Sequence, residues 1–75
     1  MEKLIEHLKE INDEVDFESA DNLVTGHILA SFDIIQIIMM LKDEYDINVP
    51  PAQIVPENFN SAEAIWKMVQ RLQDD

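Results

Sequence analysis

Apolar residues recur at helical spacing along three stretches of this chain. From Glu2 to Ile11 they follow the spacing i, i+1, i+4 and i+7 with charged residues between them, which predicts an amphipathic helix. A second helix is predicted over Ser31 to Tyr45, with Ser31 as its candidate N-cap. No Gly or Pro interrupts that segment, and Pro50 and Pro51 follow beyond its end.

The third helix is predicted to open at Asn60 or Ser61, because Asn60 and Glu63 have capping-box spacing, and to run to about Leu72. Its apolar face contains Ile65, Met68, Val69 and Leu72. The segment from Ala52 to Asn58 is ambiguous and fits one helical turn after Pro51 and another around Pro56. No segment alternates long enough to form a strand. The predicted fold is therefore all-α, a small four-helix bundle formed by a single domain over residues 1–75.

The segment from Asn12 to Ala30 is predicted to be a long loop. Six acidic residues and no basic one occur from Glu10 to Asp21, and their repulsion disfavours regular structure. Four apolar side chains are expected to pin this loop to the core: Val15, Phe17, Leu23 and Ile28. Ordered loops of this length in small domains are usually functional.

The helix predicted over Ser31 to Tyr45 has more apolar surface than one core-facing stripe can use. At about 100° per residue, one sector faces the core and contains Ile34, Ile37, Ile38, Leu41 and Tyr45. A second sector contains Phe32, Ile35 and Met39 together with Gln36, Lys42 and Asp43. Three apolar side chains fringed by polar groups indicate a docking surface, unless the long loop folds back over them.

Composition narrows the possible partners. Sixteen acidic against five basic residues give a net charge of −11, which argues against binding to nucleic acid or to anionic membranes and leaves basic protein partners open. Cysteine is absent, so the chain itself offers no disulfide, thiolate metal site or thiol nucleophile. The N-terminal segment lacks the apolar region of a secretory signal, and the run from Ile34 to Leu41 is too short to span a membrane. We expect a cytoplasmic monomer without direct membrane insertion.

Ser31 is the main candidate for chemistry. The N-terminus of a helix carries unpaired N–H groups and partial positive charge, which would favour a phosphodiester attached to this serine. The residue types of a hydrolase triad are present in Ser31, His27 and Asp33. We do not expect a hydrolase, however, since the sequence shows no oxyanion loop and the chain is too small for a substrate pocket.

The residues around Ser31 resemble a known family. The segment Ala30-Ser31-Phe32-Asp33, with the apolar run that follows it, resembles the phosphopantetheine attachment motif of acyl and peptidyl carrier proteins, usually Asp-Ser-Leu followed by an acid and an apolar run. The Tyr-Asp-Ile-Asn-Val-Pro exit at 45–50 and the Glu-Asn-Phe-Asn-Ser step at 57–61 follow in family order, so the resemblance covers nearly the whole chain. Within the family, the chain looks most similar to stand-alone carriers of the D-alanyl or aminoacyl type.

The resemblance implies a carrier and not an enzyme. Ser31 would accept 4′-phosphopantetheine from coenzyme A, and an acyl or aminoacyl group would be held on that arm as a thioester. The implied partners are a phosphopantetheinyl transferase, an adenylating ligase and a downstream acyltransferase or synthase. The residues that would face these partners are Phe32, Asp33, Ile35, Gln36, Met39 and Asp43.

Three positions depart from the family pattern. Ala30 replaces an aspartate that the family associates with recognition by the transferase and its metal, Gln36 replaces a position that is often acidic, and Lys42 adds a base. Gln36 and Lys42 weaken the negative helix face and weigh against a role in fatty-acid synthesis. Ala30 leaves open whether modification of Ser31 is slowed or lost. An alternative therefore stays open, an unmodified carrier-like adaptor that binds a protein through Phe32, Ile35 and Met39, with Ser31 as a helix cap only.

The negative charge is distributed unevenly along the chain. Residues 1–46 hold 12 acidic and 3 basic residues, whereas residues 47–75 hold 4 acidic and 2 basic residues. The half that contains Ser31 is therefore expected to produce a field that steers basic partners towards the proposed attachment site.

Overall fold

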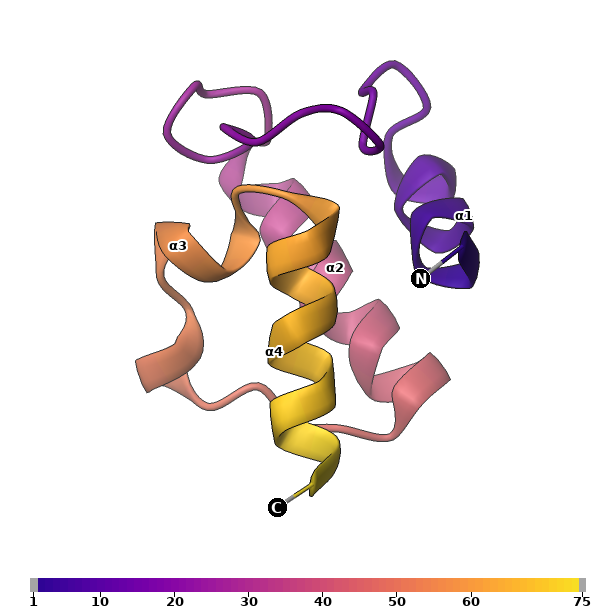
Figure 1. The fold of residues 1–75 in the computed structure, drawn as a ribbon, viewed down its shortest axis with the longest axis vertical. Helices are drawn as coiled ribbons and strands as arrows, with labels where there is room; N and C mark the ends of the chain where they lie inside the picture. Colours follow the sequence, from indigo (N-terminus) through magenta and orange to yellow (C-terminus); the bar gives the residue numbers. More distant parts are fainter. Residues whose placement is uncertain (1, 75) are drawn as a thin grey trace.

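The computed structural model describes residues 2–74, which form helices and loops and contain no strand. The helices are α1 (Glu2–Ile11), α2 (Ser31–Tyr45), the 3₁₀ turn η1 (Pro51–Gln53), α3 (Pro56–Phe59) and α4 (Ala62–Asp74). In Figure 1, α4 stands in front of α2, with α1 and α3 on opposite sides. Contacts join α1 to α2, and α4 to each of the other three α-helices. The predicted all-α four-helix architecture is confirmed, and η1 and α3 are the two single turns expected near the prolines.

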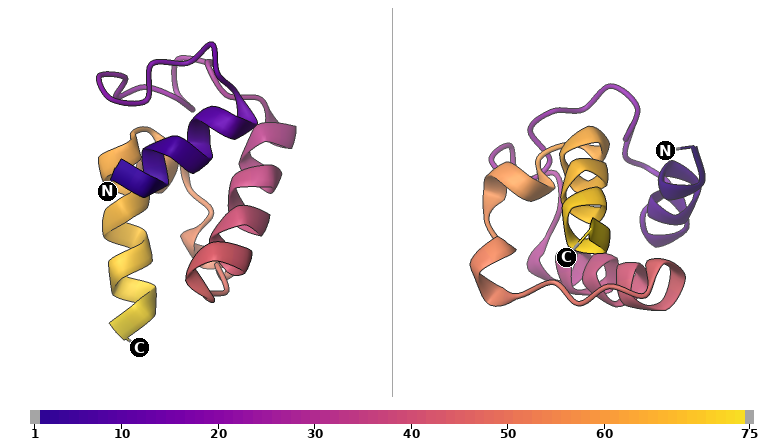
Figure 2. Two further views of the ribbon diagram at one scale, coloured as in Figure 1. Left: turned by 90° about the vertical axis from the view of Figure 1, so that its right-hand side faces the viewer. Right: turned by 60° about the horizontal axis from the view of Figure 1, so that its bottom comes forward.

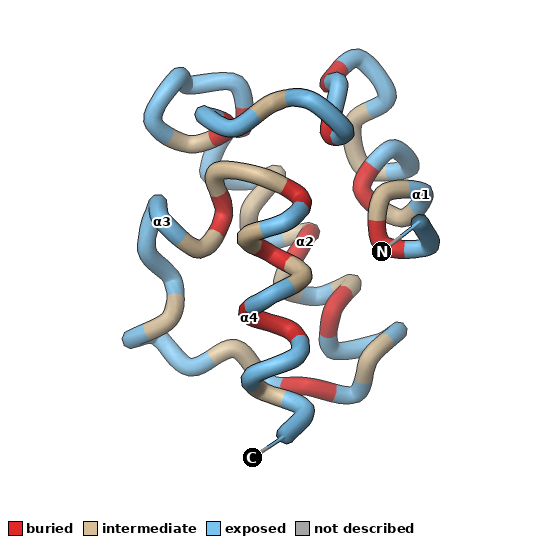
Figure 3. The backbone as a smooth tube through the Cα atoms, in the orientation of Figure 1, coloured by how far each residue is buried: buried red, intermediate tan, exposed pale blue. Residues whose placement is uncertain are grey.

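The core lies between the four α-helices and the loop that connects α1 to α2, as the buried segments in Figure 3 show. It includes Leu4, Leu8, Val15, Phe17, Leu23, Leu29, Ile37, Leu41, Ile47, Phe59, Ala62, Ile65, Met68 and Val69. No polar or charged residue is buried in the part of the chain that the structure describes. Because each large buried aliphatic or aromatic side chain contributes about 1.5–3 kcal/mol, stability rests on apolar burial.

The inner face predicted for α2 is confirmed. Ile37 and Leu41 are fully buried, and the other three predicted inner residues, Ile34, Ile38 and Tyr45, are partly buried against the same core.

Residues 12–30 form an ordered loop that crosses one end of the molecule (Figures 1 and 2). Three of the four predicted pins, Val15, Phe17 and Leu23, are buried. The fourth prediction is wrong, because Ile28 is 40% exposed and Leu29 lies in the core in its place. The Leu29 N–H donates a 2.8 Å hydrogen bond to the Leu23 carbonyl, and this bond closes the second half of the loop with both leucines facing inward.

Helix α2 has the predicted bounds but a different cap. Its N-cap is Ala30, with the extended angles φ −85° and ψ 167°, and the Ala30 carbonyl accepts the Ile34 N–H at 3.2 Å. The prediction that Ser31 is the N-cap is therefore wrong, since Ser31 is already the first residue of the helix. At the other end, Asp46 adopts the left-handed conformation with φ 53°, which ends the helix.

Helix α4 begins at Ala62 and is capped by Ser61, whose Oγ accepts the Ala64 N–H at 3.0 Å. The predicted capping box between Asn60 and Glu63 is wrong, because the Asn60 side chain binds the distant loop instead. The predicted apolar face of this helix is correct, with three residues buried and the last partly buried: Ile65, Met68, Val69 and Leu72.

An aromatic contact joins three helices near the C-terminal end of α2. The Tyr45 ring makes edge contacts with His7 of α1 at 6.4 Å and with Trp66 of α4 at 5.9 Å between ring centroids. His7 Nε2 also lies 3.7 Å from Glu44 Oε1. Burial, and secondarily the charge of Glu44, raise the pKa of Tyr45. These contacts hold the end of α2 against α1 and α4, and Trp66 is partly exposed.

Candidate functional site

Ser31 lies exposed where the long loop meets α2. Because Ala30 occupies the N-cap position, the Ser31 hydroxyl is not needed to cap the helix. The first N–H groups of any α-helix have no partner within the helix, so Ser31 lies at the positive end of the α2 dipole. An anionic group on this hydroxyl would therefore be electrostatically favoured.

Only one half of a capping box is possible at this helix end. The Asp33 carboxylate accepts the Ala30 N–H at 3.1 Å, but alanine has no side-chain oxygen to accept an N–H from the first turn in return. Asp33 is partly buried, and one of its carboxylate oxygens makes this contact. Asp33 was predicted to face partner proteins, and it also holds the backbone at the start of α2.

The second apolar sector of α2 is exposed, as predicted. Phe32 is 66% exposed, Ile35 is 53% exposed and Met39 is 61% exposed, so the long loop does not fold back over them. We call these three residues the α2 apolar face. It begins directly after Ser31, which brings an exposed hydroxyl and an exposed apolar surface together on one helix.

The α2 apolar face has few charged neighbours. Among the polar residues predicted to border it, Asp43 is exposed, whereas Gln36 is only partly exposed. Lys42 adjoins Asp43 and opposes its charge, and Glu44 lies towards His7 of α1. The largest excess of acidic residues lies on the long loop, which holds five acidic residues and no Lys or Arg, outside this face.

Asn60 organises the loop that precedes Ser31, a role that the sequence pattern did not reveal. Its side-chain oxygen accepts the N–H groups of Val24 and Thr25, both at 3.0 Å. Its backbone carbonyl accepts the Leu23 N–H at 2.9 Å. The only local signal was the spacing to Glu63, which indicated a helix cap.

A small apolar cavity of about 100 Å³ adjoins the start of α2. The lining residues come from the loop, from the first turns of α2 and from the segment around α3: Val24, Ile34, Ile54, Val55, Pro56 and Phe59. Val24 is one of the two residues held by the Asn60 side chain, so the loop anchor also contributes to this cavity.

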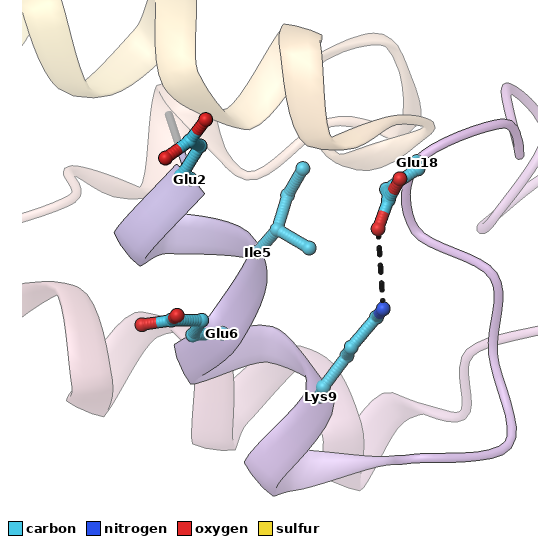
Figure 4. Close-up of a pocket in the computed structure, with 5 residues that line it drawn as sticks. All are labelled: Glu2, Ile5, Glu6, Lys9 and Glu18. Carbon is cyan, nitrogen blue, oxygen red and sulfur yellow. Dashed lines mark hydrogen bonds and ion pairs between the residues drawn. The ribbon is translucent and has the colours of Figure 1, made fainter.

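A larger surface cleft of about 610 Å³ lies elsewhere, between α1 and the first half of the loop. Figure 4 shows Glu2, Ile5, Glu6 and Lys9 along α1, with the Lys9 side chain pointing to Glu18 of the loop. Lys9 Nζ and Glu18 Oε1 form a 3.2 Å ion pair across it. Ser31 does not line this cleft, so the cleft is not part of the site around the serine.

Two further observations concern metals and membranes. Within residues 2–74, no three His, Asp or Glu side chains lie in an arrangement that could hold a metal ion. None of the helices in the same range is long and apolar enough to cross a membrane.

Comparison with known proteins finds a relative that is named as a carrier protein. The chain is 37% identical over 41 residues to Aminoacyl carrier protein 1 of Bradyrhizobium diazoefficiens. This similarity supports the carrier protein family. The match covers 55% of this chain and 46% of that relative, so the chain spans about half the length of the relative it matches. No family model matches the sequence. The resemblance to carrier proteins was inferred from the serine motif together with the segments at 45–50 and 57–61. This relative confirms it over part of both chains.

Proposed function

We propose that this protein is an acyl or aminoacyl carrier and that Ser31 is the attachment site of 4′-phosphopantetheine. The observation that carries the proposal is the exposed Ser31 hydroxyl, which stands at the start of α2 and is free of any capping duty. The similarity to an aminoacyl carrier protein supports the same function. When bound, the group supplies a thiol that can hold an acyl or aminoacyl cargo as a thioester, which a chain without cysteine cannot supply itself.

The residues around Ser31 suit this task in two ways. In the proposed transfer Ser31 Oγ bonds to the phosphorus that carries the pantetheine, the pyrophosphate bond of coenzyme A breaks, adenosine 3′,5′-bisphosphate leaves and the hydroxyl proton passes to the transferase or to water. The N–H groups of the first α2 turn stabilise the negative charge of the phosphodiester. Because Ser31 is exposed, an attached arm can extend into solvent towards another protein. This chain acts as a handle in the proposal, and the chemical steps belong to its partner enzymes.

The proposed partners are a phosphopantetheinyl transferase, an adenylating ligase and a downstream acyltransferase or synthase. The acidic residues of the long loop steer basic surfaces towards the carrier, and the α2 apolar face then makes the close contact. Added salt should therefore slow association more than it speeds dissociation. We further propose that the protein works as a monomer in the cytoplasm.

The proposal is tested by intact mass after incubation with coenzyme A and a broad-specificity phosphopantetheinyl transferase. We expect the wild-type protein to gain the mass of one phosphopantetheine and the Ser31→Ala variant to gain none. Circular dichroism of Ser31→Ala should match the wild type, because the serine hydroxyl does not cap α2. Absence of a mass gain with several transferases would contradict the proposal.

The exposed α2 apolar face also favours a second candidate, a carrier-like adaptor that needs no modification. The Ala30 substitution, which removes an acid associated with transferase recognition in the family, is in line with this alternative. An adaptor would bind its protein partner equally well after Ser31→Ala and would lose binding after Phe32→Ala. A carrier would lose function after Ser31→Ala even if the partner still bound.

A further inference from the structure

Three consecutive backbone N–H groups of the long loop converge on one residue of the α3–α4 junction. Leu23 donates to the Asn60 carbonyl at 2.9 Å, and Val24 and Thr25 both donate to Asn60 Oδ1 at 3.0 Å. Val24 and Asn60 are partly buried, so water replaces these bonds poorly if the side chain is removed. Asn60 thus anchors the loop to the opposite side of the bundle, where the second half of the loop lies near α3 and the start of α4 (Figure 1).

The anchored segment is closed on itself just before the serine. The Leu29 N–H donates to the Leu23 carbonyl at 2.8 Å, and both leucines are buried. The Gly26 N–H of this closed segment donates at 2.7 Å to the carbonyl of Asn22, the residue just before the segment. Only Ala30 separates Leu29 from Ser31. Residues 23–25 are thus tied to Leu29, and few freely rotating backbone bonds lie between Leu29 and the start of α2. Holding residues 23–25 in place therefore also limits the movement of Ser31.

A shared cavity, lined by Val24 and the first turn of α2, also links the anchored loop to the region of Ser31. Val24, which the Asn60 side chain holds, lines the apolar cavity of about 100 Å³ together with Ile34 of α2. Ile34 lies less than one helical turn after Ser31. Movement of Val24 would therefore alter the packing of the first α2 turn as well as the loop.

From these contacts we infer that Asn60 is a positioning residue, which holds the loop so that Ser31 is presented to the modifying enzyme in one arrangement. This inference rests on the proposed function, since it concerns modification of Ser31. Asn60 acts through residues 23–30 and need not touch the transferase. Its one side-chain oxygen accepts two N–H donors, which a carboxylate can also do and an alanine cannot.

The test compares Asn60→Ala with Asn60→Asp and with Ser61→Ala as a matched control. Ser61→Ala removes the α4 cap, at a stability cost typical of N-caps, and leaves the Asn60 side-chain bonds in place. Each full-length protein is assayed for amide hydrogen exchange at Val24 and Thr25. The same proteins are then titrated as substrates of a broad-specificity phosphopantetheinyl transferase with coenzyme A.

For Asn60→Ala we expect about tenfold faster exchange at Val24 and Thr25, from the loss of their common acceptor. We also expect the KM for the carrier to rise by about the same factor with little change in kcat, because only a fraction of the molecules then presents Ser31 correctly. Asn60→Asp should restore both values. Ser61→Ala should leave both the exchange at these amides and the KM near wild type.

Gly26→Ala provides a second perturbation of the same loop that does not alter Asn60. A Cβ at this position would lie 2.6 Å from Asn22 Nδ2 and 2.7 Å from the Asn22 carbonyl oxygen, so the loop has to shift. We expect its KM to rise as for Asn60→Ala, and this variant serves if Asn60→Ala does not fold.

The outcomes separate this inference from the proposed function. A wild-type protein that no transferase modifies overturns the proposed function, and with it the role of Asn60 at Ser31. Modification of the wild type with an unchanged KM for Asn60→Ala and Gly26→Ala overturns the inference alone. An equal rise in KM for Ser61→Ala, or no rescue by Asn60→Asp, also overturns it, because the effect would then follow general stability.

Discussion

The N-terminus of α2 lacks a side-chain cap, and adding one tests how this helix end is held. Ala30 is exposed and already has the extended conformation of an N-cap, so Ala30→Ser and Ala30→Asp require little rearrangement of the backbone. Either new side chain offers an oxygen to an N–H of the first helical turn. A cap of this kind contributes about 1 kcal/mol relative to alanine. In a domain of this size, about 1 kcal/mol raises Tm by about 4–8 °C.

The two substitutions separate capping from charge. Ala30→Ser adds an acceptor only, whereas Ala30→Asp also adds a negative charge near the Asp33 carboxylate, which accepts the Ala30 N–H at 3.1 Å. Repulsion between the two carboxylates opposes the favourable interaction with the helix dipole. We therefore expect the serine variant to be at least as stable as the aspartate variant at low salt, with a smaller difference at high salt because salt screens the repulsion.

Thermal unfolding followed by circular dichroism measures both effects, with Ala52→Ser as the control. Ala52 is another exposed alanine and does not precede an α-helix, so its substitution should change stability by less than about 0.5 kcal/mol. If neither Ala30 variant raises Tm above that control, the reasoning is refuted, since a side-chain acceptor at position 30 then adds nothing to this helix end and water already satisfies the N–H groups of the first turn. In the transferase assay, Ala30→Asp should be modified faster than the wild type, and equal rates would show that Ala30 is no handicap.

Two further predictions concern the core and the aromatic contact. Ile37→Ala should lower the free energy of unfolding by about 2–5 kcal/mol, because Ile37 is fully buried. Ile35→Ala, on the exposed α2 apolar face, should change it by less than about 0.5 kcal/mol. Urea unfolding measures both values, and equal losses would contradict the assignment of the two faces. The raised pKa of Tyr45 means that the folded state favours the neutral phenol, so this contribution to stability is present below about pH 10, the unfolded pKa, and is lost as the pH rises through the higher folded pKa. Stability measured against pH should therefore fall less steeply above about pH 10 for Tyr45→Phe than for the wild type, and parallel curves would show that Tyr45 does not contribute to the alkaline loss.

Much of the candidate site was predictable because its signals are local. The bounds of α1 and α2 agree with the sequence prediction, since apolar spacing and the absence of Gly and Pro act within one helix. The exposure of Phe32, Ile35 and Met39 was predictable for the same reason, because the angle between positions on a helix is fixed by its geometry. The attachment role of Ser31 stays a proposal that the mass measurement tests.

The caps were less predictable, because several neighbouring residues were chemically suitable. Ser31 and Asn60 are both good N-cap residues, yet Ala30 and Ser61 take those positions. A one-residue difference in where a helix starts decides which side chain meets its free N–H groups. That start depends on how the preceding loop enters the helix, and capping preference alone does not specify the path of the loop.

The helical class, the two apolar faces of α2, the charge distribution and the serine motif could all be inferred without a structure, since each depends on residues close together in the chain or on simple counts. Packing of the folded chain was needed to show that Leu29 and not Ile28 enters the core. It was also needed to show that Asn60 holds a distant loop, with a separation of 36 residues to Val24. These choices depend on which distant groups meet when the bundle packs. Helical periodicity carries no information about such partners, so the contact between Asn60 and the loop before Ser31 became visible only in the folded chain.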